Sequence, residues 1–115
     1  MSDFVRRCEN IMCERHERLL FFFRTLYKSK PIPVQESGVP MQEVIAALSK
    51  EDWANNVDRR RNNKWGWCFW TDTKKQIHCE AVEEDFEQLH MRGYIYIDAN
   101  GQIWPTARAW LALGR

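Results

Sequence analysis

The sequence has no apolar run long enough to cross a bilayer, which takes about 18 residues. Its longest run, Leu19–Phe23, is short and is flanked by Arg18 and Arg24. The residues after Met1 also lack the apolar segment and the small-residue cleavage site of a secretion signal. We therefore expect a cytoplasmic protein that does not contact a membrane.

Motifs typical of catalysis are absent too. The chain has no glycine-rich phosphate loop, no nucleophile elbow and no His-Glu-x-x-His motif. Its histidines, His16, His78 and His90, are scattered, and each is more typical of a structural histidine than of a general base. We expect neither enzymatic activity nor a bound cofactor.

None of the cysteines belongs to a Cys-x-x-Cys pair, the usual half of a zinc site. Cys68 and Cys79 would face each other across a predicted hairpin, and Cys13 with His16 could complete a tetrahedral site. Alternatively, Cys68 and Cys79 are reduced thiols that fill space in the core. We favour this second interpretation, and expect no metal.

The chain is rich in aromatic residues, which make up 13% of its 115 residues. That share excludes a disordered chain, because disordered segments carry few aromatics. The length suits one domain with one core, so residues 1–115 are treated as a single domain.

The formal net charge of +1 conceals two segments of opposite sign. Between Arg59 and Lys75 there are six basic side chains and one acidic side chain. Between Glu80 and Asp98 there are six acidic side chains and one basic side chain. The whole chain therefore gives no electrostatic argument for nucleic-acid binding, but its first segment gives a local one.

Hydrophobic periodicity predicts helices in the first half of the chain. A first helix runs from Ser2 to about Lys28, and could break in the polar stretch Cys13–Arg18. Pro31–Val34 should be extended, because each proline restricts the residue before it and lacks an N–H donor. A second helix starts near Pro40, and its inward residues are Val44, Ile45 and Leu48.

A third helix is predicted over residues 50–63, opened by a capping box at residues 49–52. Trp53, Ala54 and Val57 would form its inner face. Only a short turn separates it from the second helix, which is the spacing that a helix-turn-helix requires.

The aromatic and alternating residues 65–81 predict a hairpin with its loop at residues 72–75. That loop pairs Trp70 with Ile77, and Cys68 with Cys79. The predicted core face holds Cys68, Trp70, Ile77, Cys79 and Ala81, and the opposite face holds Trp65, Trp67 and Phe69 with Gln76, His78 and Glu80.

A fourth helix is predicted over residues 81–92, with Val82, Phe86 and Leu89 inward and its carboxylates outward. Gly93 ends it. A second hairpin follows, with its turn at Asn100-Gly101, and Thr106 caps a short last helix that ends at residue 113.

This order of elements resembles the winged-helix family of helix-turn-helix domains over residues 14–81. We therefore expect an α+β fold: a winged-helix-like single domain with a long N-terminal helix, two β-hairpins and a short C-terminal helix. Residues 81–113 would be appended to that core. The resemblance implies that residues 50–63 form the recognition helix and that residues 72–75 form the wing.

A second stretch, Leu89–Ile95 followed by Asp98, Gly101, Ile103, Pro105 and Thr106, is similar to the end of the recognition helix and the wing in small winged-helix regulators. On this register, residues 80–92 would be the recognition helix. Five of them are acidic and would face phosphates, and about thirty residues before them would have no counterpart in the family. We take this register as support for the fold class, and as an argument against DNA docking by residues 80–92.

The leading hypothesis for function is a small DNA-binding accessory or regulatory protein. Arginine can bind guanine and asparagine can bind adenine through paired hydrogen bonds, and lysine binds phosphates. The predicted base-reading residues are Asn55, Asn56, Arg59, Arg60 and Asn63, and the predicted phosphate-binding residues are Lys64, Lys74 and Lys75.

The competing hypothesis is a module that binds another protein, for example a phage-encoded or mobile-element-encoded inhibitor or adaptor of a host complex. One candidate surface is the aromatic hairpin face away from the core, Trp65, Trp67 and Phe69, although we favour the alternative that the first helix or the C-terminal segment covers it. The other is the acidic helix with Glu83, Glu84 and Glu87, for which we favour the simpler interpretation of an ordinary solvated face. The long first helix could supply the seam of a homodimer.

Overall fold

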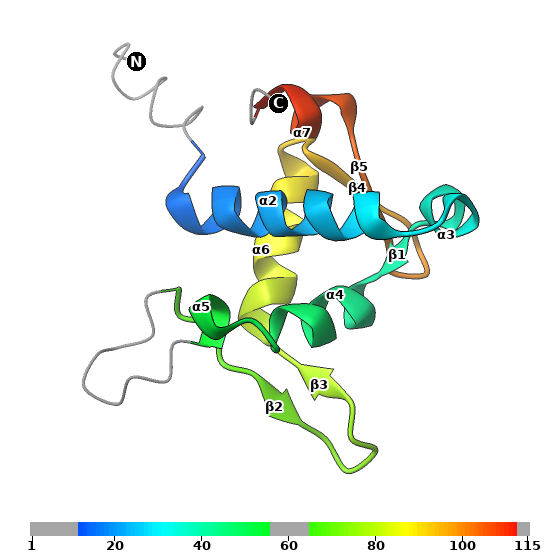
Figure 1. The fold of residues 1–115 in the computed structure, drawn as a ribbon. Coiled ribbons are helices and arrows are strands. Elements are labelled where there is room, and N and C mark those ends of the chain that lie inside the picture. The colour runs from blue at the N-terminus through cyan, green and yellow to red at the C-terminus, as the bar shows by residue number, and fades with distance from the viewer. Residues whose placement is uncertain (1–11, 56–64, 113–115) are drawn as a thin grey trace, which may run out of the picture.

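The computed structural model describes residues 12–55 and 65–112. Its elements, in chain order, are α2 (Glu14–Ser29), α3 (Ile32–Ser37), β1 (Val39–Pro40), α4 (Met41–Leu48), α5 (Asp52–Asn55), β2 (Trp70–Thr71), β3 (Ile77–His78), α6 (Glu80–Met91), β4 (Ile95–Ile97), β5 (Gln102–Pro105) and α7 (Ala107–Ala112) (Figure 1). Helices and strands are mixed along the chain, as expected for an α+β fold.

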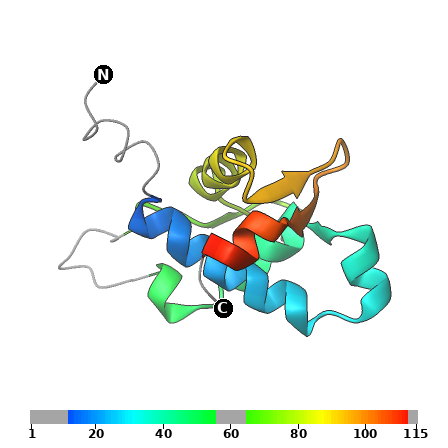
Figure 2. The same ribbon diagram turned by 90° about the horizontal axis from the view of Figure 1, so that it is seen from above.

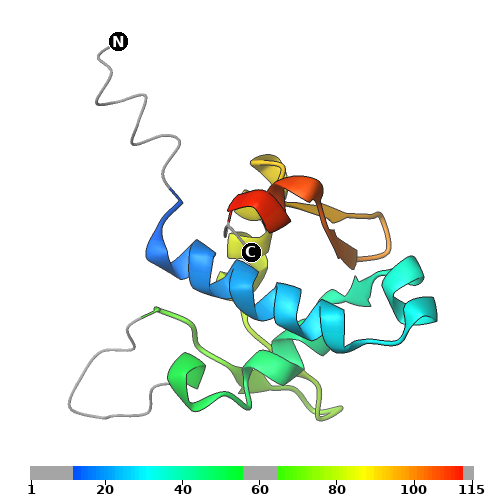
Figure 3. The same cartoon turned by 45° about the horizontal axis from the view of Figure 1, so that its top comes forward.

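The strands form two separate antiparallel sheets. One has the order β1-β5-β4, so the short strand before α4 pairs with the last strand, Val39 opposite Ile103. The other is the β2–β3 hairpin alone. Figure 3 shows α4, α5 and the β2–β3 hairpin on one side of α2, and α7 with the β4–β5 hairpin on the other. From above, α7 lies across α2, where the Arg24 guanidinium stacks on the Trp110 ring at 4.5 Å (Figure 2).

The core lies where α2, α4 and α6 meet the three-stranded sheet. Phe23 of α2 and Phe86 of α6 touch edge to face, with ring centroids 5.9 Å apart. The predicted inward faces of the second and fourth helices are confirmed, since these residues are all buried: Val44, Ile45 and Leu48 of α4, and Val82, Phe86 and Leu89 of α6.

The predicted first helix starts at Glu14 in the structure, because Cys13 is extended (φ −68°, ψ 156°). The part of that prediction before Met12 lies outside the described residues. The polar stretch after Cys13 is helical without a break. It remains helical because His16 faces inward beside Leu19 and Leu20.

The prediction of an extended segment at Pro31–Val34 is wrong, because helix α3 begins at Ile32. Pro31 occupies the N-cap position and Pro33 the first turn, where a helix needs no N–H donor. The helix ends at Gly38, whose φ of +86° only glycine adopts readily.

Two predicted caps are also wrong in detail. Ser49 has helical backbone angles and ends α4, and its hydroxyl donates to the Ala46 carbonyl instead of capping a following helix. Thr106 precedes α7, but its hydroxyl donates to the carbonyls of Gly93 and Tyr94. Of the predicted helix over residues 50–63, the described part contains only α5, and residues 56–64 lie outside it.

The first hairpin forms, but its register differs from the predicted one by one residue. Trp70 pairs with His78, and Thr71 with Ile77. Asp72 closes the loop instead of lying in it, since its N–H donates to the Gln76 carbonyl at 2.9 Å. The loop therefore has three residues and ends at Lys75, which adopts a left-handed conformation (φ +65°).

A one-residue change of register moves every side chain to the other face of a strand. Trp67 is only 1% exposed and Trp65 is buried beside it, whereas Cys68 and Trp70 are exposed. The predicted core face of the first arm of this hairpin is therefore wrong. Cys79 is buried as expected of a thiol that fills core space, but Cys68 is exposed, and the observed register does not place the two directly opposite each other. No group of His, Cys, Asp and Glu side chains within residues 12–55 and 65–112 could hold a metal ion.

Candidate functional site

The loop of the β2–β3 hairpin lies at the end of the molecule opposite α7 (Figure 1). Its residues, Thr73, Lys74 and Lys75, are exposed. Neither lysine forms an ion pair with any residue in the described part of the chain. The loop therefore presents two unneutralised positive charges to solvent.

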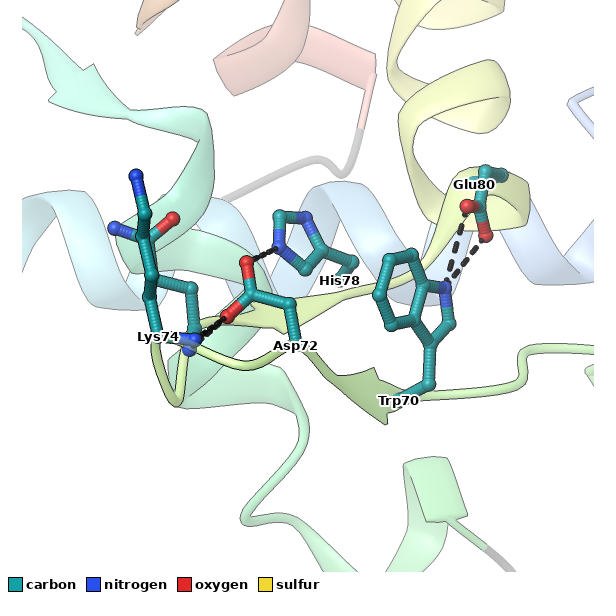
Figure 4. A network of polar contacts seen from close by, with 6 residues as sticks. Trp70, Asp72, Lys74, His78 and Glu80 are labelled. Carbon is teal, nitrogen blue, oxygen red and sulfur yellow. Dashed lines mark hydrogen bonds and ion pairs between the residues drawn. The ribbon is translucent and has the colours of Figure 1, made fainter.

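Asp72, the only acidic residue between Trp65 and Cys79, directs its charge into the hairpin. One carboxylate oxygen accepts the N–H groups of Lys74 at 2.8 Å and Gln76 at 2.9 Å, and the other lies 2.8 Å from His78 Nε2 (Figure 4). The hydrogen bond with His78, together with the backbone donors, lowers the pKa of Asp72. These internal contacts occupy the carboxylate and leave the loop positive.

The β4–β5 hairpin has the same turn. The Asp98 N–H donates to the Gln102 carbonyl at 3.0 Å, and its carboxylate accepts the N–H groups of Asn100 and Gln102. Gly101 (φ +79°) stands in the position that Lys75 occupies in the first hairpin. The turns of the two hairpins thus have the same backbone conformation but differ in charge, because only the first carries lysines in its loop.

An exposed aromatic pair lies just behind the lysine loop. The Trp70 ring stacks on His78, with centroids 4.6 Å apart and planes 26° apart. Its indole N–H donates to the Glu80 carboxylate at 3.0 and 3.2 Å (Figure 4). This hydrogen bond lowers the pKa of Glu80. Contacts at both ends of the pair therefore fix the orientation of the indole.

A buried carboxylate anchors the segment that leads into this hairpin. Asp85 of α6 is 3% exposed and accepts hydrogen bonds from Trp67 Nε1 at 2.7 Å and Arg15 Nε at 2.9 Å, with His16 Nε2 at 3.0 Å. Burial raises its pKa, but these hydrogen bonds and the charge of Arg15 outweigh burial and hold the pKa below its usual value. The carboxylate joins α2, α6 and the segment before β2.

The prediction that Asp85 lies with the outward carboxylates of its helix is wrong. A signal was present, because Asp85 follows Val82 by three residues and precedes Leu89 by four, the spacing of one helix face. Its partners could not be read from the sequence, since His16 is 69 residues away.

The aromatic residues of the predicted non-core hairpin face are covered and form an interior cluster. Trp65 and Trp67 stack at 5.6 Å, and Trp53 meets both edge to face. Trp65 Nε1 donates to the Trp53 carbonyl at 3.0 Å, and Phe69 is half-buried against the core. Since Trp65, Trp67 and Phe69 are covered, they do not form the partner-binding surface considered above.

The predicted nucleic-acid-binding residues, both base-reading and phosphate-binding, are only partly described. Asn55 uses its side-chain amide to donate to the carbonyls of Glu51 and Ser49, and is half-buried, so it does not present that amide to a base. The other members of the set, Asn56, Arg59, Arg60, Asn63 and Lys64, lie outside the described residues. Lys74 and Lys75 are the described members that face solvent.

The acidic helix presents its carboxylates as predicted, apart from Asp85. Glu83, Glu84 and Glu87 are exposed on one stripe of α6, and Met91, 77% exposed, continues that stripe. Within the described part of the chain these glutamates have no ion-pair partner.

A groove of about 320 Å³ lies between α2 and the α4–α5 region. Phe22, Leu26 and Trp53 line it, together with the exposed ring of Phe21. The Arg18 guanidinium stacks on Trp53 at 4.3 Å. This groove is an apolar part of the surface around α2.

No helix among the described residues combines the length and the apolar character needed to span a membrane. Charge and exposure instead single out the β2–β3 hairpin and the outer face of α6 as the features of this surface. No family model, no curated protein and no solved structure matches this chain.

Proposed function

We propose that this chain is a winged-helix-like protein that binds nucleic acid through the β2–β3 hairpin. The sheet order β1-β5-β4, with α2, α4 and α6 in sequence around it, supports the second of the two registers. On that register α6 takes the place of the recognition helix and β4–β5 that of the wing. Residues 49–79 are then an insertion between α4 and α6.

The acidic face of α6 argues against DNA docking by that helix. Glu83, Glu84 and Glu87 would approach the phosphates, and like charges brought together repel. The inserted segment has the opposite character, because its hairpin ends in Lys74 and Lys75. The contact with nucleic acid is therefore assigned to the insertion.

The observation that carries the proposal is the isolated positive charge of the hairpin loop. Asp72 is held by internal hydrogen bonds, so Lys74 and Lys75 remain unpaired within the described residues. Lysine ammonium groups bind phosphates as point charges, without reading the base sequence. Such binding is weak or moderate and depends strongly on salt.

The second hairpin provides a matched test. The double variant Lys74→Asn, Lys75→Gly gives the first loop the residues of the Asn100-Gly101 turn, so it removes both charges and keeps the backbone. We expect the slope of log affinity against log salt to fall by about 1.8 on duplex DNA, or about 0.9 for each phosphate that a lysine no longer neutralises. Fluorescence anisotropy with a labelled mixed-sequence duplex over a salt series measures it.

The fold control for this variant is its free energy of unfolding. Glycine relieves the left-handed conformation of Lys75, so the variant should be at least as stable as the parent. A stable variant with unchanged affinity would remove the hairpin from the interface. If the parent binds no nucleic acid even at low salt, the proposed function is wrong.

A second candidate function, docking of a basic protein on α6, is favoured by the acidic stripe. Glu83 and Glu87 are four residues apart, a spacing at which like charges destabilise a helix by roughly 0.2–0.5 kcal/mol per pair. Since no ion pair among the described residues offsets this repulsion, the stripe suits a basic partner. Met91 would add an apolar contact at its end.

The double variant Glu83→Gln, Glu87→Gln tests this candidate. Its free energy of unfolding should stay within about 0.5 kcal/mol of the parent value, because the lost repulsion between Glu83 and Glu87 is offset by the lost interaction of Glu83 with the helix dipole in the first turn of α6. It should also weaken binding of a lysine- and arginine-rich model peptide, which the hairpin variant should bind as the parent does. Equal peptide binding by the parent and by the glutamine variant would exclude α6 as the docking face.

A further inference from the structure

Trp70 is an exposed aromatic residue that the protein holds in one orientation. Its side chain is 47% exposed on the β2–β3 hairpin, and one ring face packs on His78 across the two strands. Of the described residues, no other ring contacts Trp70. An indole fixed in this way offers a flat apolar surface to solvent.

The indole N–H of Trp70 and one ring nitrogen of His78 already have hydrogen-bond partners. The indole N–H donates to Glu80, and the ring nitrogen Nε2 of His78 lies 2.8 Å from Asp72 Oδ2 (Figure 4). A ligand on Trp70 therefore needs no hydrogen bond to this indole. What the ring offers is stacking, which suits any flat π system.

Charges of both signs lie near Trp70: the Glu80 carboxylate accepts its N–H on one side, and the lysine loop lies on the other side, where phosphates could bind (Figure 4). The loop with Lys74 and Lys75 begins three residues beyond Trp70, roughly 10 Å along the chain at about 3.3 Å per residue. A stacking ring beside phosphate-binding cations is the combination that proteins use for single-stranded nucleic acid. Bases in a duplex are stacked on each other and do not offer a free face to a hairpin.

We propose that Trp70 is a stacking platform for an unpaired nucleobase, with Lys74 and Lys75 on the flanking phosphates. This inference rests on the nucleic-acid binding proposed above, and it narrows the ligand to a single-stranded segment. The aromatic ring supplies affinity that does not depend on salt, and the lysines supply the part that does.

The β4–β5 hairpin also carries a cross-strand aromatic pair, but without a charged loop. Tyr96 stands two residues before Asp98, as Trp70 stands two before Asp72, and its ring contacts Trp104 on the opposite strand at 5.7 Å. The loop beside it carries no lysine. Tyr96 is therefore a matched control for Trp70.

The test compares a labelled 12-nucleotide single strand with a duplex of the same length by fluorescence anisotropy over a salt series. We expect Trp70→Ala to weaken single-strand binding about tenfold or more, with its salt slope unchanged. The lysine double variant should lower the slope instead. Tyr96→Ala should bind both probes as the parent does.

Further variants separate stacking from folding. Trp70→Leu keeps apolar bulk but has no π face, so it should bind as weakly as Trp70→Ala, whereas Trp70→Phe should restore most of the affinity. Thermal unfolding checks that each variant is folded. Full single-strand affinity in a folded Trp70→Leu variant would overturn the stacking proposal. Equal losses of single-strand and duplex affinity in the Trp70 variants would also overturn it. Neither result would contradict phosphate binding by Lys74 and Lys75. No binding of either probe by the parent would overturn the platform and the proposed function together.

Discussion

Replacing Asp85 with alanine is expected to lower the free energy of unfolding by about 3–5 kcal/mol. The carboxylate is buried and is the acceptor for Trp67 Nε1, and it also meets His16 and Arg15. Without it, the hydrogen bonds from Trp67 and Arg15 and the contact with His16 are lost, and a hydrogen bond to a charged group is worth about 1.5–3 kcal/mol. The linkage between α2, α6 and the segment before the hairpin is lost with it.

Urea denaturation measures this effect, with two comparisons. Asp85→Asn keeps the shape and one acceptor oxygen, and should lose about half as much stability. Glu84→Ala, an exposed neighbour on the same helix, should change stability by less than about 0.5 kcal/mol. If Asp85→Ala behaved like Glu84→Ala, the carboxylate would not be an anchor between these elements.

The same carboxylate predicts a dependence of stability on pH. Burial raises the pKa of Asp85, but hydrogen bonds from His16 and Trp67 with the charge of Arg15 outweigh it, so the pKa lies below the ordinary 3.8. A lowered folded-state pKa means that the contribution is complete above the unfolded-state value and is lost as the pH falls through the folded-state value. The stability difference between the parent and Asp85→Asn should therefore shrink as the pH falls below about 4.

The second large effect is expected at Gly38, where Gly38→Ala should lower the free energy of unfolding by about 2–3 kcal/mol. Gly38 has φ +86° and ψ 159°, a region that is essentially restricted to glycine. An added Cβ would also come within 2.9 Å of the Trp104 ring and 3.0 Å of Gln102 Cβ. The Trp104 ring has little freedom to move away, because its N–H donates to the Glu36 carbonyl at 3.1 Å.

Gly101→Ala is the matched control for this prediction. Gly101 also has a positive φ, +79°, but a Cβ there would meet nothing within 4 Å. Its substitution should cost about 1 kcal/mol, from the backbone conformation alone. Equal losses at both glycines in urea denaturation would mean that the contact with Trp104 contributes nothing.

Local patterns in the sequence were enough for the elements whose apolar residues recur with one clear period. The inward faces of α4 and α6 follow from such spacing, and Asn100-Gly101 located the second hairpin. The exposed Glu83, Glu84 and Glu87 follow from the same periodicity. In these places local propensity and tertiary packing favour the same conformation.

The strand register of the first hairpin could not be predicted from the sequence, because its sequence is compatible with two loop lengths. A four-residue loop and a three-residue loop both fit residues 72–75, and the shorter one requires a left-handed Lys75. The left-handed conformation is disfavoured for lysine, because it brings Cβ close to the following carbonyl oxygen. Burial of Trp65 and Trp67 against Trp53 and Asp85 accompanies the shorter loop, and these partners are distant in sequence.

Neighbouring residues alone specify an α+β chain with two hairpins, a helix with an acidic outer face and a lysine-bearing loop, so these features could be read from the sequence. Which tryptophans are buried, that Asp85 lies inside and that Trp70 faces solvent emerge only when the elements pack together. Those outcomes depend on contacts between residues far apart in the chain, such as His16 with Asp85, whose free energy no local pattern contains.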